Sequence, residues 1–235
     1  MVKVAVLGAS GQIGQPLSLL LKSLRLYDVV HAIGVATDLN HIDTPAPVKG
    51  YLPENDGLRH ALTGAEVVLI SAGRYPVTDK EHLFNTNAAI IADLAAGVAE
   101  FCPKALVGII TNPVNRVQFG GDEIVKAKAG AGSATTCMAY AGFRFAQAII
   151  KASQGQPGVV EPVYVYLPGI EGGDSIAREL GVDYFAVPVS FGANGAETAH
   201  TIGTLSDYET QLLKVAVGEL AGNIKKGEDF VASRS

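Results

Sequence analysis

Cysteine is scarce in this chain: only Cys102 and Cys137 occur among 235 residues, and no CxxC spacing joins them. Such usage argues against a metal site and is typical of reduced, half-buried thiols in an intracellular protein. No apolar run approaches the roughly 18 residues that a membrane-spanning helix needs. No basic stretch accompanies the net charge of −5. We therefore expect no metal, no membrane and no nucleic acid among the partners.

Charged residues make up only 17% of the chain and apolar residues 48%, a balance that argues against disorder and allows a large buried core. The length predicts one large domain or two small ones. The sequence contains no internal repeat and no low-complexity tract. The first expected strand begins at residue 2, so we expect no signal or transit peptide.

The segment Val2–Gly14 joins a short apolar run to three glycines, and an amphipathic segment up to Lys22 follows at once. This order predicts strand, tight turn and helix, which is the context that supports a dinucleotide-binding glycine motif. A negative diphosphate can bind backbone N–H groups at the helix N-terminus, and glycine lets it approach closely. The alternative is a glycine-rich turn with a purely structural role. The motif assigns to the cofactor Gly8, Ala9, Ser10, Gly11, Gln12, Ile13 and Gly14.

An acidic residue, Asp28, ends the short apolar segment that begins at Leu24, about 20 residues after the first glycine. A carboxylate at this distance holds the ribose 2′-hydroxyl of the adenosine and repels a 2′-phosphate. Asp28 therefore favours NAD over NADP. The alternative is an ordinary turn aspartate.

Strands that alternate with helices over residues 1–115 predict an α/β fold with a parallel, Rossmann-type sheet. The expected strand at 65–73 ends in small residues, which let a cofactor lie close to the sheet. Residues 53–57 are expected to form a loop, and the polar segment 74–82 is a candidate lid. A further strand at 105–110 leads to Asn112, whose amide offers a donor and an acceptor to a ligand.

The pattern changes in the second half, which we expect to form a reduced α+β lobe. The predicted division is residues 1–115 for the nucleotide-binding domain and 116–235 for the second domain. Ser206 and Glu209 have the spacing of a helix-capping box. The expected elements are a long helix at 134–153, antiparallel strands at 159–166 and 184–190, and a terminal helix at 204–226.

Five motifs of this sequence form a recognisable set: VAVLGASGQIGQPLSLLL (4–21), DLNHIDTP (38–45), LFNTNA (83–88), IITNPVN (109–115) and KAKAGAGSA (126–134). Taken together, they resemble the malate dehydrogenases of the mitochondrial and glycosomal type. The resemblance implies a two-lobed, NAD-dependent enzyme that interconverts malate and oxaloacetate, usually as a homodimer. We also expect a cytoplasmic or glycosome/peroxisome-like location, for which Ser233-Arg234-Ser235 is a weak signal that matches the peroxisomal S-K-L address poorly; a frayed tail is the alternative.

The resemblance also implies roles for single residues. The turn from Gly8 to Gly14 would hold the diphosphate, and Asp28 the adenosine ribose. Asn112 would in addition lie near the substrate. The residues implied at the nicotinamide end are Asn87, Ile110, Thr111, Asn112 and Met138.

The chemistry of a 2-keto acid reductase requires residues that this chain does not carry. A histidine oriented by an aspartate protonates the carbonyl oxygen, and arginines bind the substrate carboxylates. The family supplies the histidine from a His-Ala/Ser-Gly segment and the aspartate and one arginine from a Leu-Asp-x-x-Arg helix. Both belong between Asn115 and the helix that starts near Gly120, where only Arg116-Val117-Gln118-Phe119 intervene, and neither motif occurs elsewhere in the chain.

The expected lid departs from the family as well. Lys80 stands at the position of the second substrate arginine, and Arg74 is a shifted stand-in for the first. Lysine keeps the charge but loses the bidentate geometry. His82, beside the lid, is a weak candidate for the general acid, and a solvated histidine at a helix start is the default interpretation. Among the other histidines, His41 is expected to pack or to cap a helix.

Two hypotheses follow. In the first, the protein is a malate dehydrogenase and the sequence as given lacks a segment that the protein has. In the second, the deletion is real, and the chain is a catalytically dead paralogue that acts as a nucleotide-binding or assembly subunit. A deletion from the second lobe is also expected to expose an apolar patch or to require a partner subunit.

Overall fold

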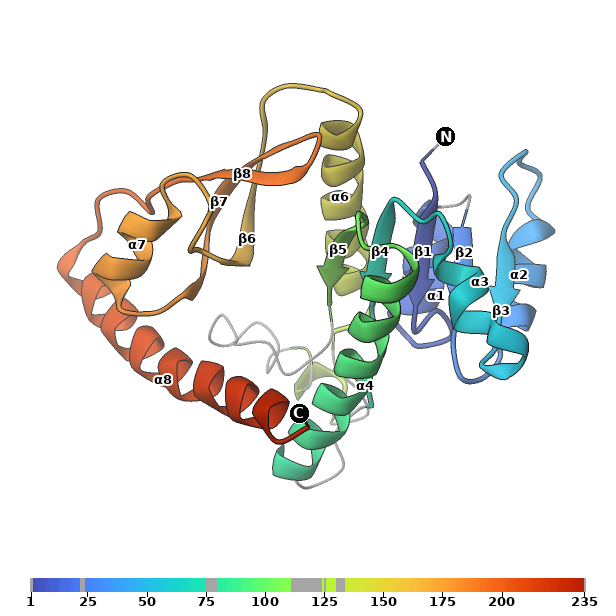
Figure 1. Cartoon of the computed structure of the whole chain (residues 1–235), viewed down its shortest axis with the longest axis horizontal. Coiled ribbons are helices and arrows are strands. Elements are labelled where there is room, and N and C mark those ends of the chain that lie inside the picture. Colours follow the sequence, from blue (N-terminus) through green and yellow to red (C-terminus); the bar gives the residue numbers. More distant parts are fainter. Residues whose placement is uncertain are drawn as a thin grey trace. The chain divides into compact units, whose positions relative to one another are not determined.

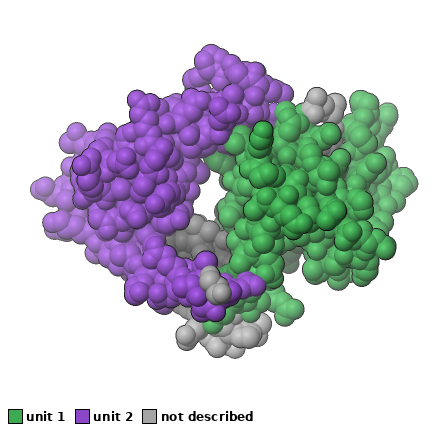
Figure 2. Space-filling view, viewed as in Figure 1, with its two compact units in different colours: residues 1–146 green, residues 147–235 purple. Residues whose placement is uncertain are grey.

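The computed structural model describes residues 2–21, 24–74, 80–110, 124, 126–129 and 134–234, without the side chains of 80–83. The chain forms two compact units, Met1–Ala146 and Gln147–Ser235, which Figure 2 colours separately. The predicted domain boundary after residue 115 stays a prediction. In the described part of the chain, no helix is both long and apolar enough to cross a bilayer.

Unit 1 is built on a five-stranded parallel sheet with the order β3-β2-β1-β4-β5 (Figure 1). All four residues of β1 and of β4 are buried, as expected for central strands of a parallel sheet that is covered on both faces. This arrangement confirms the predicted α/β class. The strands are β1 (Val4–Leu7), β2 (Leu24–Tyr27), β3 (Lys49–Tyr51), β4 (Val67–Ile70) and β5 (Leu106–Ile109).

Helices connect these strands, and one of them was not predicted. Residues 53–57 were expected to be a loop, but Glu54–Asp56 form a 3-10 turn that leads directly into α3 (Gly57–Leu62). The loop expectation was wrong because Leu62 is fully buried and holds the short helix on the core. The remaining helices of this unit are α1 (Gly14–Leu21), α2 (Ala32–Asn40), α4 (Lys80–Phe101) and most of α6 (Thr136–Ser153).

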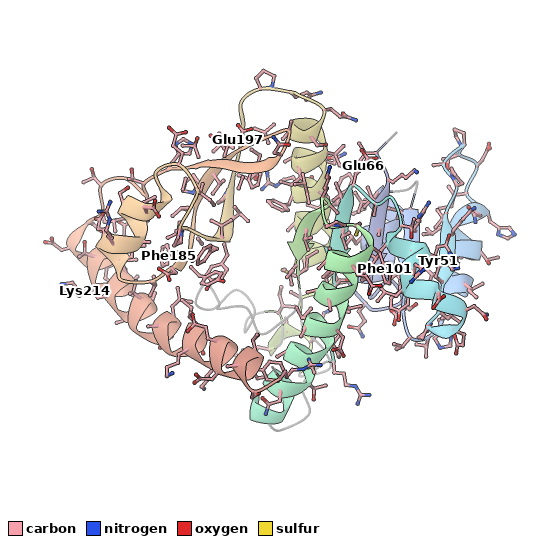
Figure 3. The ribbon with its side chains drawn as sticks, in the orientation of Figure 1. Tyr51, Glu66, Phe101, Phe185, Glu197 and Lys214 are labelled. Carbon is pink, nitrogen blue, oxygen red and sulfur yellow. The ribbon has the colours of Figure 1, made fainter. Side chains whose placement is uncertain are left out.

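The core between the sheet and α4 contains Leu7, Ile70, Leu94 and Val98, all buried. The guanidinium of Arg59 on α3 lies 5.0 Å from the ring centroid of Phe101 at the end of α4; Phe101 is labelled in Figure 3. These contacts pack α4 on the sheet and join α3 to the end of α4.

Unit 2 contains a three-stranded antiparallel sheet with the order β6-β7-β8. On one face, Val187 and Val189 pack with Ile176 of α7, and Phe185, labelled in Figure 3, lies against the same cluster. The predicted α+β character is confirmed, but α7 and β8 were missed. The elements are β6 (Val159–Tyr166), α7 (Gly173–Leu180), β7 (Tyr184–Gly192), β8 (Gly195–Ala199) and α8 (Asp207–Ala232).

The opposite face of this sheet carries apolar side chains that are partly exposed. Val160, Tyr164 and Tyr166 alternate along β6 and are 48%, 41% and 49% exposed. Alternate residues of a strand share one face, so the three side chains form an apolar stripe, with Tyr184 of β7 packed beside Tyr164 and Tyr166. The stripe agrees with the expectation of an exposed apolar patch, and the alternative expectation, a partner subunit, stays a prediction.

The predicted capping box opens α8. The side-chain oxygen of Ser206 accepts a hydrogen bond from the N–H of Glu209 at 3.3 Å, and Glu209 Oε2 accepts one from the N–H of Ser206 at 2.8 Å. The helix begins at Asp207 and runs past the predicted end to Ala232.

The two cysteines differ in exposure. Cys102 is buried, and burial raises the pKa of its thiol, whereas Cys137 is exposed rather than half-buried.

Candidate cofactor site

The turn between β1 and α1 depends on two of its three glycines for close packing. Gly8 has φ +86°, and a Cβ there would lie 2.4 Å from the backbone N of Ala72. A Cβ at Gly14 would lie 2.1 Å from the carbonyl oxygen of Gly8. At Gly11 the nearest atom would be 3.4 Å away, an ordinary contact. Gly11 is therefore dispensable for packing, and its lack of a side chain keeps the outer face of the turn open.

The first N–H groups of α1 are available to a ligand. The N–H of Gln15 donates to the carbonyl of Gly11 at 3.0 Å, which is the first hydrogen bond of the helix. Within the described part of the chain, no group accepts from the N–H groups of Gln12, Ile13 or Gly14. Such unpaired donors at a helix start, with no acidic residue in the first turn, fit the negative charge of a dinucleotide diphosphate.

Asp28 lies directly against the same turn. Its Oδ2 accepts a hydrogen bond from the N–H of Ser10 at 2.8 Å, and its Oδ1 accepts one from the N–H of Val29 at 2.7 Å. The hydroxyl of Ser10 in turn donates to the carbonyl of Val30 at 2.7 Å. The carboxylate is thus oriented by backbone groups. Because a carboxylate offers about four lone-pair sites, it can still accept from a ribose hydroxyl.

Sequence reasoning missed the apolar surface beside this carboxylate. Val29, Val30 and Ile33 are 69%, 51% and 53% exposed. Exposed β-branched residues next to a ribose-binding aspartate offer a flat apolar contact for an adenine ring. The sequence does contain a signal for this surface, since two valines follow the acidic residue directly.

Tyr27 lies next to Asp28 in the chain. Burial, and then the charges of Asp28 and Glu54, raise the pKa of its hydroxyl.

Asn87 holds the backbone at the base of the expected lid. Its Oδ1 accepts from the N–H of Arg74 at 2.8 Å, and its Nδ2 donates to the carbonyl of Arg74 at 3.3 Å. Asn87 is only 3% exposed, whereas Arg74 is exposed. The pair fixes the point at which the chain leaves β4, so the amide of Asn87 is engaged by protein backbone.

Only some of the remaining predicted site residues are among those that the structure describes. The N–H of Ile110 donates to the carbonyl of Ile70 at 2.8 Å, and Met138 on α6 is 37% exposed. The site roles of Asn87, Ile110 and Met138 stay predictions. So do those of Thr111 and Asn112, and of the side chains of Lys80 and His82, which lie outside the described residues.

The described histidines have other structural roles. His41 is the C-cap of α2, as expected, and its Nδ1 lies 2.8 Å from the carbonyl oxygen of Thr37. His60 stacks on Tyr51, which Figure 3 labels, with ring centroids 6.1 Å apart. His200 Nε2 lies 2.7 Å from the hydroxyl of Ser190. In the part of the chain that the structure describes, no histidine is hydrogen-bonded to a carboxylate.

A parallel sheet, a glycine turn packed on β4 and a carboxylate at the end of β2 define a dinucleotide-binding protein of the dehydrogenase type. Residues 2–132 match the model of the lactate/malate dehydrogenase NAD binding domain. Residues 99–231 match the lactate/malate dehydrogenase alpha/beta C-terminal domain. The chain belongs to the lactate/malate dehydrogenase family, on the malate dehydrogenase side, and its cofactor is NAD.

Curated relatives support this placement over nearly the whole chain. The mitochondrial malate dehydrogenase of Schizosaccharomyces pombe is 39% identical over 319 residues, which cover 98% of this chain and 92% of the relative. The mitochondrial malate dehydrogenase of Homo sapiens is 37% identical over 321 residues, covering 97% and 91%.

Solved structures share the fold. The apo malate dehydrogenase of Picrophilus torridus superposes with a TM-score of 0.84 at 17% identity, covering 100% of this chain and 99% of that one. The malate dehydrogenase of Archaeoglobus fulgidus, solved with NADH, gives a TM-score of 0.74 at 21% identity, covering 97% and 100%.

The alignments also show that residues are missing inside the chain. The alignment with the yeast relative spans 319 positions, and this chain has 235 residues, so at least 84 positions, 319 less 235, have no residue here. Because the same alignment covers 92% of the relative, the gap is internal. The family's histidine and Leu-Asp-x-x-Arg motifs are absent from this sequence.

Proposed function

We propose that this chain binds NAD and NADH as a malate dehydrogenase would, while the 235-residue polypeptide itself turns over malate or oxaloacetate negligibly. The family reaction is the oxidation of malate to oxaloacetate, for which bound NAD supplies the hydride acceptor. In this chain the N–H groups of Gln12, Ile13 and Gly14 would bind the diphosphate. Asp28 would bind the adenosine ribose.

The proposal that the chain turns over malate negligibly depends on one observation. The proton of the malate hydroxyl needs an acceptor that is itself held by a carboxylate, and no described histidine has one. The sequence contains neither family motif that would supply the pair. A general acid or base contributes about 10²–10⁴-fold to the rate, and the loss of the substrate arginine adds to this deficit.

The test is a titration of the purified chain with NADH, followed by nucleotide fluorescence and by calorimetry. The intact mass is measured first: a value near 24.4 kDa establishes that the protein is the chain described. The proposal predicts saturable binding. Absence of any fluorescence change or heat at millimolar NADH would refute it. A mass several kilodaltons larger would instead support the first hypothesis, that the protein contains the missing catalytic segment.

A second candidate function is that of a nucleotide-binding assembly subunit, and the apolar stripe on β6 favours it. Contiguous exposed apolar surface is typical of interfaces. We propose self-association into a homodimer as its simplest form. Sedimentation velocity at micromolar concentration tests it, and a monomer at all concentrations up to about 100 μM would contradict it.

A further inference from the structure

The antiparallel sheet of unit 2 carries a serine and a histidine that contact each other. The hydroxyl oxygen of Ser190 lies 2.7 Å from Nε2 of His200. Ser190 lies on β7 opposite Thr198 of β8, and His200 directly follows the end of β8 (Figure 1). The three residues belong to unit 2, so the pair is formed within one compact unit and apart from the proposed cofactor site.

The backbone of the two strands positions this pair. The N–H of His200 donates to the carbonyl of Pro188 at 2.9 Å, which continues the pairing of β7 and β8 beyond the last residue of β8. The register shifts between Ser190 and Phe191, and a bulge of this kind bends a strand and changes the direction of its side chains. Ser190 is half-buried and His200 is exposed, so both are accessible to a small molecule.

A serine hydroxyl within hydrogen-bond reach of an imidazole is the arrangement that makes a hydroxyl nucleophilic. In the tautomer with its proton on Nδ1, Nε2 of His200 accepts a hydrogen bond from the hydroxyl and can take up its proton. Within the described residues, the side chains of Ser190 and His200 have no hydrogen-bond partner other than each other. The nearby hydroxyl of Thr198 donates instead to Oε2 of Glu171 at 3.2 Å, so it does not compete for the imidazole.

Apolar side chains of β6 lie on the same face of the sheet, next to the pair. Val160 is the cross-strand partner of Ser190. Directly opposite residues of antiparallel strands have Cβ atoms about 4.5–5.5 Å apart and share a face. Val160 is 48% exposed, and Tyr164 continues the apolar stripe along the strand. The face therefore offers a short apolar group a surface beside the Ser190 oxygen.

We infer that Ser190 is a nucleophile, with His200 as its general base, for activated carboxylic esters that carry a short apolar acyl group. The Ser190 oxygen attacks the ester carbonyl carbon while Nε2 of His200 takes the hydroxyl proton. The tetrahedral intermediate expels the alcohol, which leaves with that proton, and the acyl group stays on Ser190. Water then attacks the acyl-serine with His200 again as the base, which releases the carboxylic acid and restores the hydroxyl.

The test treats the purified chain with p-nitrophenyl butyrate in the absence of nucleotide. Release of p-nitrophenol is followed by absorbance, and acid-quenched samples are weighed by mass spectrometry for the addition of a butyryl group. Peptide mapping then assigns the group to a residue, which separates Ser190 from the exposed thiol of Cys137.

Two variants remove one member of the pair each, Ser190→Ala and His200→Gln. Thr198→Val is the matched control for the serine, because it removes a neighbouring hydroxyl that is bonded to Glu171. His60→Gln is the matched control for the histidine, because it removes an imidazole that stacks on a tyrosine in unit 1. Thermal unfolding establishes that each variant is folded.

The parent chain is expected to carry a butyryl group on Ser190, and Ser190→Ala to carry none at that position. His200→Gln is expected to slow labelling of Ser190 by about 10²-fold, the lower end of what a general base contributes. Thr198→Val and His60→Gln are expected to label as the parent does. Val160→Ala is expected to lower the preference for the butyrate over the acetate ester by about threefold, because less apolar surface contacts the acyl chain.

A quenched parent chain with no butyryl group on Ser190 would overturn the inference. Labelling of Ser190 at the parent rate in His200→Gln would overturn it too, because the serine would then react without its base. An equal loss in Thr198→Val would do the same, since the effect would then belong to the sheet face as a whole. The NADH titration of the parent chain tests the proposed function alone, so the failure of either proposal is distinguished from the failure of the other.

Discussion

The backbone N–H of Ser10 donates a 2.8 Å hydrogen bond to the carboxylate of Asp28, and this bond joins the glycine turn to the end of β2. The two residues belong to the two parts of a dinucleotide site, the diphosphate turn and the ribose-binding strand end. A second bond, from the Ser10 hydroxyl to the Val30 carbonyl, strengthens the same connection. Asp28 therefore both stabilises the glycine turn and is placed to bind the adenosine ribose.

Replacing Asp28 tests the choice between NAD and NADP. In Asp28→Asn the side chain keeps an acceptor oxygen for Ser10 but loses the charge that repels a 2′-phosphate. We expect the ratio of NADPH to NADH affinity to rise about 10-fold, measured by fluorescence titration. Asp38→Asn, on the exposed side of α2, removes an equal charge and is expected to leave the ratio unchanged. An unaltered ratio in Asp28→Asn would contradict the ribose assignment.

Substitutions at two glycines of the turn are expected to affect different properties: one lowers stability and the other lowers NADH affinity. Gly14→Ala places a methyl 2.1 Å from a backbone oxygen and should lower the free energy of unfolding by about 1–3 kcal/mol. Gly11→Ala meets only an ordinary contact, so its stability should stay within about 0.5 kcal/mol of the parent. Its NADH affinity should nevertheless fall, because the methyl projects from the open side of the turn. Urea unfolding and NADH titration of both variants check this, and the opposite pattern of stabilities would count against it.

The capping box of α8 predicts a dependence of stability on pH. Hydrogen bonds from the backbone and side chain of Ser206 hold the pKa of Glu209 below its usual range. A carboxyl whose folded-state pKa is lowered stabilises the fold above its unfolded-state pKa, and that contribution is lost as the pH falls through the folded value. Glu209→Gln should therefore reduce the fall in stability between pH 6 and pH 3, as followed by urea unfolding. Ser206→Ala should cost about 1 kcal/mol at neutral pH. Identical pH profiles for the parent and Glu209→Gln would argue against the contribution of Glu209.

The apolar stripe on β6 predicts that apolar surface can be removed without loss of the fold. Tyr164→Thr and Val160→Thr substitute exposed side chains on this face, so each should change stability by less than about 0.5–1 kcal/mol. Together they should reduce binding of an apolar fluorescent dye and shift the sedimentation profile towards monomer. Val215→Thr, on α8 at 59% exposure, is the control outside the stripe. A dye signal that falls equally in the control would contradict the stripe as the interface.

The parts that could be predicted from the sequence are those set by neighbours in the chain. The strand, turn and helix from Val4 to Leu21 follow from an apolar run and glycines at fixed spacing, and the structure reproduces them. The capping box of α8 is equally local, because both partners lie three residues apart. Asp28 could be assigned by its distance from the first glycine, since one helix and one strand separate the two.

The parts that could not be predicted depend on contacts between distant residues. Helix α3 follows Pro53 and contains a glycine, so local preference indicated a loop, and burial of Leu62 against the core overrides that preference. The hydrogen bonds between Asn87 and the backbone of Arg74 join a helix to the segment that follows β4. The pair of Ser190 and His200 depends on the hairpin of β7 and β8, and β8 was not predicted.

The central claim is that this chain has retained cofactor binding and lost proton transfer, and one parallel assay tests it most directly. Oxaloacetate reduction is followed as NADH oxidation at saturating NADH, for the 235-residue chain and for the Schizosaccharomyces pombe malate dehydrogenase at equal concentration. The account predicts a rate for this chain lower by about 10⁴-fold or more. A rate within about tenfold of the yeast enzyme would contradict it.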